Sequence, residues 1–257
     1  MRRYDRKKLP LKAYEKLELS LMPTRHESTI VTSVTIKSDS LVSFLHEKKI
    51  KIFPWVLFAC LKTVMHYPQL QRFVLNNQLY QHKQMSISTV IKKDKQVAGN
   101  NSFAKIVLTE TDDVVSISEK LNKLISQTRS EQGNNSDKLI QGFGKFPPSV
   151  FKIIKHGLSL LDKWDWLPNS IIDDDPLHTT AVIANLGSID GFSVNHHLYN
   201  WGTASMFITF GRLKEDGSLD VTFSVDERIS EGMVLFKALT LFKDILENPY
   251  EHVSKDC

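Results

Sequence analysis

The chain is poor in the residues that mark disorder or a secreted scaffold. Its 257 residues include 11 glycines, 9 prolines and 2 cysteines. With 41% hydrophobic residues and no low-complexity tract, we expect a sizeable core and no extended disorder away from the ends. Cys60 lies in an apolar run and Cys257 is the last residue. They form no disulfide framework, which favours a reducing compartment.

Targeting signals and a membrane span are also missing from the sequence pattern. The basic N-terminus is not followed by an uninterrupted apolar run, so no signal peptide is predicted. The longest apolar run, at residues 53–65, is interrupted by Lys62 and is too short to cross a bilayer. The net charge of +4 is mild; it suits an anionic ligand but gives little support to nucleic-acid binding. We therefore predict a soluble, cytoplasmic protein.

Common motifs for nucleotides, metals and nucleophiles do not occur. The sequence has no P-loop, no G-x-G-x-x-G, no pair of C-x-x-C motifs and no G-x-S-x-G. His178 is the only addition near the pair His196 and His197, and further ligands at suitable spacing are missing. We predict no metal.

Apolar periodicity predicts an α+β fold. Alternating stretches predict strands at residues 29–36, 103–108, 179–184, 205–212 and 219–225, with a hairpin at 79–92. Helical spacing predicts helices at residues 41–49, 54–67, 114–129, 147–166 and 233–246. A tight turn at residues 215–217 joins the last two strands. Repeated βαβ units are absent from this order, so we expect a mixed or antiparallel sheet.

The predicted helix at residues 147–166 has more than one interpretation. Its apolar stripe comprises Val150, Ile153, Ile154, Leu158, Leu161 and Trp164. Three lysines lie to one side, so the stripe fits a core, a partner surface or a shallow membrane contact. Apolar helical stripes are usually buried, which favours core or oligomer packing over a membrane contact. The acidic run at residues 173–175 that follows is predicted to be a solvated turn, and contact with a cationic acceptor is the alternative.

Three segments of the chain carry a family resemblance. Residues 61–73 (LKTVMHYPQLQRF) are similar to a helix that ends in a P-x-L-N turn, and residues 182–187 (VIANLG) are similar to F-T-I-S-N-L-G. Residues 226–232 (DERISEG) follow a strand and precede a helix closing on LENP, as do the signatures D-H-R-x-x-D-G and H-H-x-x-x-D-G. The chain thus resembles dihydrolipoyl acyltransferases and chloramphenicol acetyltransferases. It also resembles free-standing bacterial acyltransferase-subunit-like proteins.

The resemblance spans about residues 10–250 and implies a chloramphenicol-acetyltransferase-like two-layer α+β sandwich. It implies one catalytic domain over residues 1–257, without a lipoyl or peripheral-subunit-binding domain. Proteins of this kind are trimers whose site lies at the subunit boundary. Coenzyme A and the acceptor enter that site from opposite ends of a tunnel. We therefore expect a homotrimer that uses acyl-coenzyme A as co-substrate with a small-molecule acceptor.

The resemblance also locates the catalytic positions, and two of them differ from the family. The family's histidine base falls on Glu227, and its oxyanion serine falls on Ala184, which has no hydroxyl. A free glutamate has a pKa of about 4.3, roughly two units below that of imidazole. Burial at a dry subunit boundary raises the pKa of a glutamate. Loss of an oxyanion donor costs on the order of 10²-fold in rate. Glu231 replaces the second acid of the signature.

Thr209, Asn185 and Gly232 complete the predicted site. Thr209 stands two residues before Gly211, as in the F-T-M-G of chloramphenicol acetyltransferases, which implies a role in stabilising the tetrahedral intermediate; an ordinary strand threonine is the alternative. Asn185 in the S-N-L-G-like turn and Gly232 at the end of the signature are assigned to coenzyme A binding.

A second candidate base lies in residues 196–202 (HHLYNWG), which nearly spell H-H-x-x-x-D-G. This segment leads into a strand rather than a helix, so we assign the signature to residues 226–232. His197 remains an alternative base because imidazole titrates near neutral pH; hydrogen-bonded loop histidines at an interface are the other interpretation. Two functions stay open. The chain is either an acyl-coenzyme A-dependent acyltransferase with a non-standard centre, or an inactive homologue that binds a ligand or partner as a trimer.

Overall fold

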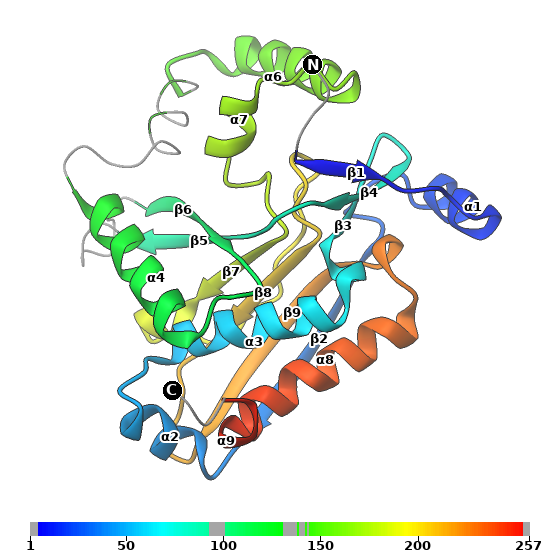
Figure 1. Cartoon of the computed structure of the whole chain (residues 1–257). Helices are drawn as coiled ribbons and strands as arrows, with labels where there is room; N and C mark the ends of the chain where they lie inside the picture. The colour runs from blue at the N-terminus through cyan, green and yellow to red at the C-terminus, as the bar shows by residue number, and fades with distance from the viewer. Residues whose placement is uncertain (1–4, 93–100, 131–137, 139–141, 143, 254–257) are drawn as a thin grey trace.

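A six-stranded mixed sheet forms the centre of the computed structural model, which describes residues 5–92, 101–130, 138, 142 and 144–253 (Figure 1). The strand order is β2-β9-β8-β7-β5-β6. The strands are β2 (Thr29–Lys37), β5 (Met85–Lys92), β6 (Asn101–Leu108), β7 (Ala181–Asn185), β8 (Met206–Phe210) and β9 (Ser218–Asp226). β7 runs parallel to β5 and β8, whereas the other pairs are antiparallel. The predicted α+β class with a mixed sheet is confirmed.

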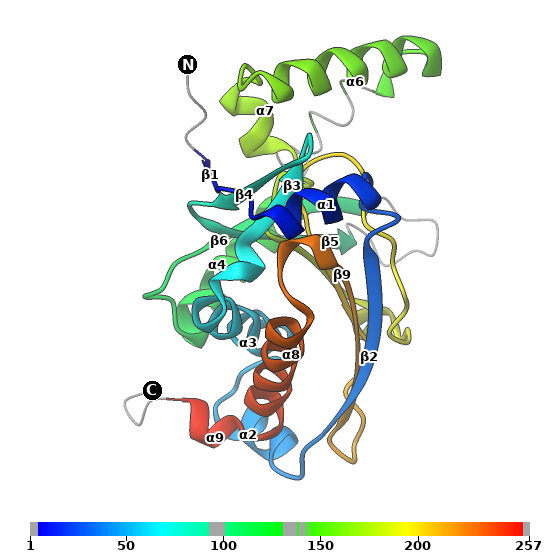
Figure 2. The ribbon, with the colours of Figure 1, turned by 90° about the vertical axis from the view of Figure 1, so that its right-hand side faces the viewer.

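Helices cover one face of this sheet. They are α2 (Leu41–Glu47), α3 (Ile52–His66), α4 (Val114–Arg129), α8 (Gly232–Glu247) and α9 (Pro249–His252). Figure 2 shows α3 and α8 side by side against the sheet. Alternate residues of β9, including Val221 and Phe223, point into the core beneath them. Since α3 lies between α4 and α8 in the layer that covers this face, it is buried along most of its length and apolar on nearly all sides, as the sequence predicts.

A three-stranded sheet with α1 (Ala13–Leu21) forms a smaller unit beside the first sheet. Its strand order is β1 (Arg6–Lys8), β4 (Gln78–His82) and β3 (Arg72–Leu75). The hairpin predicted within residues 79–92 is wrong, because β4 pairs with β3 and β1 whereas β5 joins the six-stranded sheet. The real hairpin joins β3 to β4 through Asn76 and Asn77. Both have positive φ, 50° and 55°, as a two-residue hairpin turn requires.

The helix predicted at residues 147–166 is confirmed as α6 (Pro148–Lys163), and a short helix α7 (Asn169–Asp174) follows it. Arg6 of β1 holds the end of α6: its Nη1 lies 3.4 Å from Asp162 Oδ1, and its Nε donates to Asp165 Oδ1 at 3.1 Å. This ion pair fastens α6 to the smaller sheet.

The solvated turn predicted at residues 173–175 is wrong for Asp175, which is 6% exposed. Its carboxylate accepts hydrogen bonds from Leu177 N at 2.8 Å and from the Trp201 indole, and it lies 2.9 Å from His178 Nδ1. A buried carboxylate that has several partners is stable away from water, which the local acidic pattern does not reveal.

The face of the large sheet opposite the helices is covered by residues 191–205, called the covering loop below. The loop contains no strand or helix before β8 begins. Leu198 and Ala204 of this loop pack on Val182, Ala184 and Phe207 of β7 and β8. Within the described ranges, no helix is long and apolar enough to cross a membrane.

Candidate functional site

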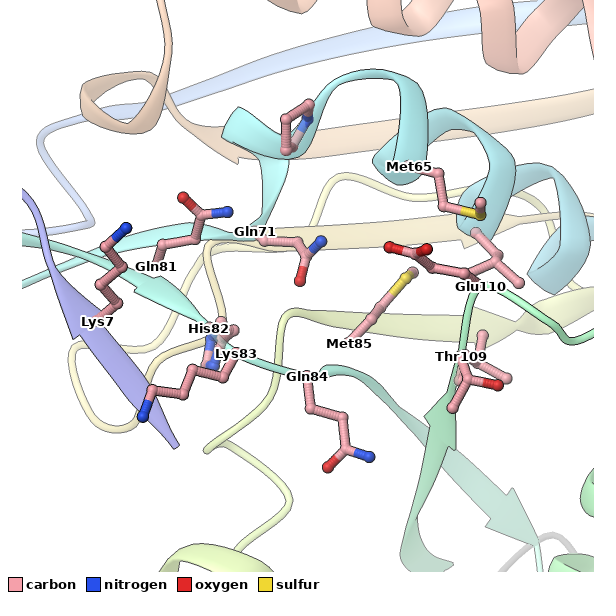
Figure 3. A pocket seen from close by; sticks show the side chains of 13 residues that line it. Lys7, Met65, Gln71, Gln81, His82, Lys83, Gln84, Met85, Thr109 and Glu110 are labelled. Atoms are coloured by element: carbon pink, nitrogen blue, oxygen red, sulfur yellow. The ribbon is translucent and has the colours of Figure 1, made fainter. Parts of the chain in front are cut away.

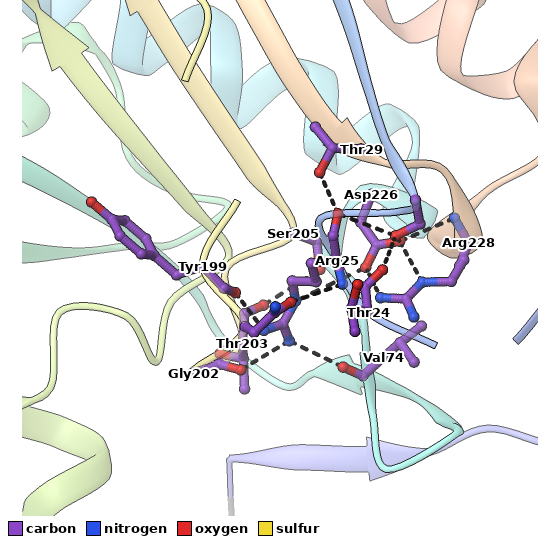
Figure 4. Close-up of polar contacts among 12 residues, drawn as sticks. Thr24, Arg25, Thr29, Val74, Tyr199, Gly202, Thr203, Ser205, Asp226 and Arg228 are labelled. Carbon is purple, nitrogen blue, oxygen red and sulfur yellow. Dashed lines mark hydrogen bonds and ion pairs between the residues drawn. The ribbon is translucent and has the colours of Figure 1, made fainter. Parts of the chain in front are cut away.

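The signature segment 226–232 begins at a buried aspartate at the end of β9. Asp226 is 0% exposed. Its Oδ1 accepts hydrogen bonds from Ser28 Oγ at 2.9 Å and from Arg228 Nε at 2.8 Å, and Arg228 Nη2 donates to its Oδ2 at 2.7 Å (Figure 4). A two-pronged arginine contact is among the strongest ion pairs in proteins. Asp226 is therefore a structural anion, which holds the end of the strand.

Arg25 joins the signature segment to two other parts of the chain. Its Nη2 donates to Val74 O at 3.0 Å and to Gly202 O at 2.9 Å, and its Nη1 donates to Tyr199 O at 3.0 Å. Its Nε lies 3.9 Å from Asp226 Oδ2. Burial lowers the pKa of Arg25 to about 10, while the charge of Asp226 acts in the opposite direction. We call Arg25, Asp226 and Arg228 the ionic corner.

Glu227 lies at the ionic corner but takes no part in its ion pairs. A 3₁₀ turn, η3 (Glu227–Ile229), follows Asp226, and Glu227 N donates to Ser28 O at 3.0 Å. Its side chain is half-buried, whereas Arg228 beside it is buried. Burial raises the pKa of Glu18 on α1, and the charge of Glu227 raises it further. The carboxylate at the family's base position therefore lies near a second carboxylate.

The last two residues of the signature are at the surface of the chain. Glu231 is exposed, and its Oε1 lies 4.0 Å from Lys12 Nζ. Gly232 begins α8 and is exposed. A Cβ at Gly232 would meet nothing within 4 Å, so the chain itself gives no steric reason for glycine there.

Thr209 and Ala184 lie together on the opposite face of the sheet, under the covering loop. They are paired across β7 and β8. Thr209 is 2% exposed; its Oγ1 donates to Val194 O at 2.7 Å and accepts from Val194 N at 2.9 Å. A hydroxyl has one hydrogen to donate, and Thr209 uses it to hold the covering loop. Donation to an oxyanion requires release of Val194.

The two histidines of the covering loop stack on the same face. The His196 ring lies 3.8 Å from the Phe207 ring at an angle of 10°, and its Nδ1 is 2.8 Å from His197 O. His197 is exposed and lies 4.8 Å from the His196 ring and 5.1 Å from the Tyr199 ring. The structure thus brings His196, His197 and Thr209 to one face, with His197 open to solvent.

Asn185 lies at the end of β7, where its Oδ1 accepts from Ser188 N at 3.1 Å. It lines a cavity of about 630 Å³ whose charged residues are Lys92, Arg129 and Asp190. The two cations outnumber the one acid, so this cavity is suited to an anionic ligand.

The predicted site residues form two separate groups within one chain. Thr209 is paired with Thr222 on β9, and Glu227 follows Thr222 by five residues along the same strand and turn. At about 3.3 Å per residue along a strand, Glu227 lies roughly 16 Å along the strand direction from Thr222, and therefore from Thr209 beside it. A base and a stabilising hydroxyl must both lie within hydrogen-bond reach of the reacting atoms. Glu227 and Thr209 of one chain therefore cannot serve one substrate together.

The structure has two further cavities, one of which adjoins the covering loop at Tyr199 and Trp201. One, of about 650 Å³, lies where α3, β4 and β6 end, and its lining includes Lys7, Gln71, Gln84 and His82 (Figure 3). Burial lowers the pKa of His82 to about 3, so its imidazole is neutral. The other, of about 470 Å³, is an apolar groove beneath α6. In the described part of the chain, no group of three or more His, Cys, Asp or Glu side chains is placed to hold a metal ion.

Solved structures of acyltransferases share this fold. A chloramphenicol acetyltransferase matches with a TM-score of 0.62 at 10% identity, over 95% of this chain and 98% of that chain. The cubic core of the pyruvate dehydrogenase multienzyme complex matches with a TM-score of 0.59 at 13% identity, over 95% and 93%. A probable dihydrolipoamide acetyltransferase from Listeria monocytogenes matches with a TM-score of 0.57 at 15% identity, over 97% and 96%. No protein-family model matches the chain, and no curated protein matches it significantly.

The fold is therefore that of the chloramphenicol acetyltransferases and of the catalytic cores of dihydrolipoamide acetyltransferases. The family resemblance in the sequence is confirmed at this level. At these identities the comparison defines the fold and not the reaction.

Arg25 is the residue of the site that the sequence did not reveal. It stands in the segment PTRHES, without apolar periodicity or a motif around it. Its partners lie in β3, in the covering loop and at the end of β9, all far along the chain. Only the buried acid of the signature, which requires a countercharge, indicates that such an arginine exists.

Proposed function

We propose that this chain is an acyl-coenzyme A-dependent acyltransferase that acts on a small hydroxyl, amine or thiol, with its site between the subunits of a homotrimer. Its fold, which is that of chloramphenicol acetyltransferases, supports acyl transfer. The observation that carries the two-chain site is the separation of roughly 16 Å between Glu227 and the level of Thr209. A neighbouring copy brings its ionic corner against the covering loop, so that each site has residues from both chains.

The reaction needs one base. The base takes the proton of the acceptor, whose oxygen, nitrogen or sulfur attacks the thioester carbonyl; the coenzyme A thiolate then leaves and receives that proton. Glu227 fills this role if the subunit boundary desolvates its half-buried carboxylate. His197 is the alternative, because its imidazole is exposed beside the covered face of the sheet.

Coenzyme A is the proposed co-substrate. The cavity beside Asn185, with Lys92 and Arg129 in its lining, suits phosphate groups. Gly232 begins α8, where free backbone N–H groups favour an anion. We further propose a bacterial, cytoplasmic setting, on the basis of the resemblance and the cysteine content.

The second candidate function is an inactive trimer that binds a ligand or partner. Two observations favour it. Ala184 has no hydroxyl at the oxyanion position, and the Thr209 hydroxyl is already committed to Val194. Without a donor for the oxyanion, the rate falls by on the order of 10²-fold.

Thiol release from acyl-coenzyme A distinguishes the two functions. The assay uses acetyl- and longer acyl-coenzyme A with the wild-type chain, Glu227→Gln and His197→Ala. Glu231→Gln is the matched control, because it removes an exposed carboxylate from the same segment. We expect wild-type turnover, retained in the control and lost in one of the two variants. No turnover in any chain, with no protection of the wild type against melting by coenzyme A, contradicts the enzyme proposal.

A further inference from the structure

Helix α6 exposes a continuous apolar stripe to solvent. The outer stripe comprises Phe146, Val150, Ile153, Leu160, Trp164 and Trp166. Positions 150, 153, 160 and 164 follow helical spacing and share one face. Ile153 is 72% exposed and Trp164 is 57% exposed. The expectation of core packing therefore holds for only part of this helix, and the outer stripe needs a separate explanation.

Helix α6 is attached to the body along its inner side and at its C-terminal end. Ile154, Leu158 and Leu161 on its inner side are partly buried, and Arg6 pairs with Asp162 and Asp165 at its end. In both ribbon views α6 is the outermost element at one end of the molecule (Figures 1 and 2). The outer stripe of α6 is thus turned away from the body, on the side opposite its attachment.

The exposed charges along α6 are positive. Lys145, Lys152, Lys155 and Lys163 are all exposed. The acids between residues 145 and 166 are Asp162 and Asp165, and both are paired with Arg6. Two copies of α6 packed against each other would bring lysines together, which is unfavourable. The combination of an apolar stripe, two exposed tryptophans and uncompensated lysines fits the surface of an anionic bilayer.

We propose that α6 binds in the plane of an anionic lipid bilayer. The outer stripe enters the boundary between headgroups and acyl chains, roughly 5–10 Å deep, and the lysines lie over anionic headgroups. With 16 residues, α6 is shorter than the roughly 20 residues that span a bilayer, so it lies on the surface.

The inner side of α6 agrees with a lipid environment. Ile154 and Leu158 line the apolar groove of about 470 Å³ together with Trp201 of the body, and one cation, Lys155, and one acid, Asp175, also contribute to its lining. An apolar groove of this size suits an acyl chain. Both sides of the helix therefore favour lipids over a folded protein partner.

Vesicle co-sedimentation of the full chain tests this proposal. The vesicles contain phosphatidylcholine, alone or with about one third phosphatidylglycerol, and we expect binding to the anionic vesicles that weakens as salt rises. The double variant Ile153→Glu/Trp164→Glu should bind anionic vesicles no more strongly than the wild type binds neutral vesicles. The double variant Lys152→Glu/Lys163→Glu should lower the partition coefficient by at least about tenfold, since each basic residue contributes roughly fivefold.

The matched control is Met233→Glu/Phe236→Glu on α8, where the side chains are 71% and 64% exposed. It should bind anionic vesicles like the wild type, and all variants should melt as the wild type does, because the substituted side chains are at the surface. The proposal is overturned if the wild type ignores anionic vesicles or if the control loses binding equally. It is also overturned if Ile153→Glu/Trp164→Glu changes the oligomeric state without changing vesicle binding, since the outer stripe then faces another copy of the chain.

Discussion

The ionic corner and the covering loop hold the two groups of candidate residues in different ways. In the ionic corner, Asp226 is fully buried and paired with Arg228, and Arg25 connects it to three backbone carbonyls. The covering loop has no regular secondary structure, and it is fastened by a few hydrogen bonds, among them those of Thr209 to Val194.

The difference shows that the structural and chemical parts of the signature are separable. Asp226 and Arg228 are required by each other because an unpaired buried charge is costly. Glu227 between them is half-buried and takes no part in the pair. The side chain at position 227 can therefore differ from the family's histidine without disturbing the fold. Two of the nine histidines of this chain, His196 and His197, lie on the covering loop.

The largest expected effect comes from breaking the ionic corner. Arg25→Ala leaves Asp226 with one arginine and removes the donors to Val74 O, Tyr199 O and Gly202 O. We expect the free energy of unfolding to fall by about 3–5 kcal/mol in urea titrations. Lys214→Ala, which removes an exposed partner of Asp220, should cost less than about 1 kcal/mol. Equal, small losses in both variants would mean that the corner is not the structural centre.

Removal of the base should affect turnover and not stability. Either Glu227→Gln or His197→Ala should lower acyl-coenzyme A turnover by at least about 10²-fold. Both side chains are at least partly exposed, so unfolding should change by less than about 1 kcal/mol. Loss in Glu227→Gln assigns the base to the ionic corner, and loss in His197→Ala assigns it to the covering loop. Retained turnover in both variants excludes both bases.

Loosening the covering loop should have a smaller, local effect. Thr209→Val keeps the side-chain shape but leaves Val194 N and Val194 O without their partner. We expect a loss of about 1–3 kcal/mol and faster protease cleavage within residues 191–205. Thr222→Val is the control, because that buried hydroxyl contacts Ser33 Oγ at 2.9 Å and not the loop. Cleavage that is equally fast in both variants would contradict this role of Thr209.

The smallest effect concerns pH at the Trp201 end of the covering loop. Burial acts to raise the pKa of Asp175, but hydrogen bonds with His178, Leu177 and Trp201 outweigh it and lower the pKa. Because folding lowers the pKa of Asp175, its carboxylate stabilises the fold at pH values above its pKa in the unfolded chain, which is about 3.9. This contribution is lost as the pH falls further. The protection of the loop amides relative to their intrinsic exchange rate should thus stay high down to about pH 4 and fall below it. In Asp175→Asn this protection should be lower at neutral pH and change less with acid; a loss of protection in the wild-type loop above pH 5 would contradict the assignment.

The sequence predicted the parts of this fold that depend on local periodicity. The helices α3, α4 and α8 and the strands β7, β8 and β9 lie close to their predicted ranges, since apolar spacing directly reports which side of an element is buried. The hairpin lies at β3 and β4 rather than within residues 79–92. The signal for it is the pair Asn76 and Asn77, whose positive φ values form the two-residue turn between these strands.

Long-range polar contacts were not predictable in the same way. The pairing of Arg25 with Asp226, and that of Asp175 with His178 and Trp201, depend on tertiary arrangement. The amphipathic pattern of residues 147–166 predicts a helix, but it does not show what contacts the apolar stripe of that helix. The positions of Glu227 and Thr209 followed from the resemblance, but their separation followed only from the strand register.

Cross-linking tests the central claim that the ionic corner of one chain faces the covering loop of the next. Burial raises the pKa of the Cys60 thiol to about 12, so it does not react, and Cys257→Ser removes the other thiol. Two single variants are made in this background, Glu227→Cys and Val194→Cys. Val194 is exposed, and its backbone is held by Thr209. The two variants are mixed, reassembled and treated with a bismaleimide shorter than roughly 16 Å. The account predicts two-chain products from the mixture and few from either variant alone or from a mixture with Lys214→Cys. A monomeric chain, or a mixture that yields no more product than this control, would contradict it.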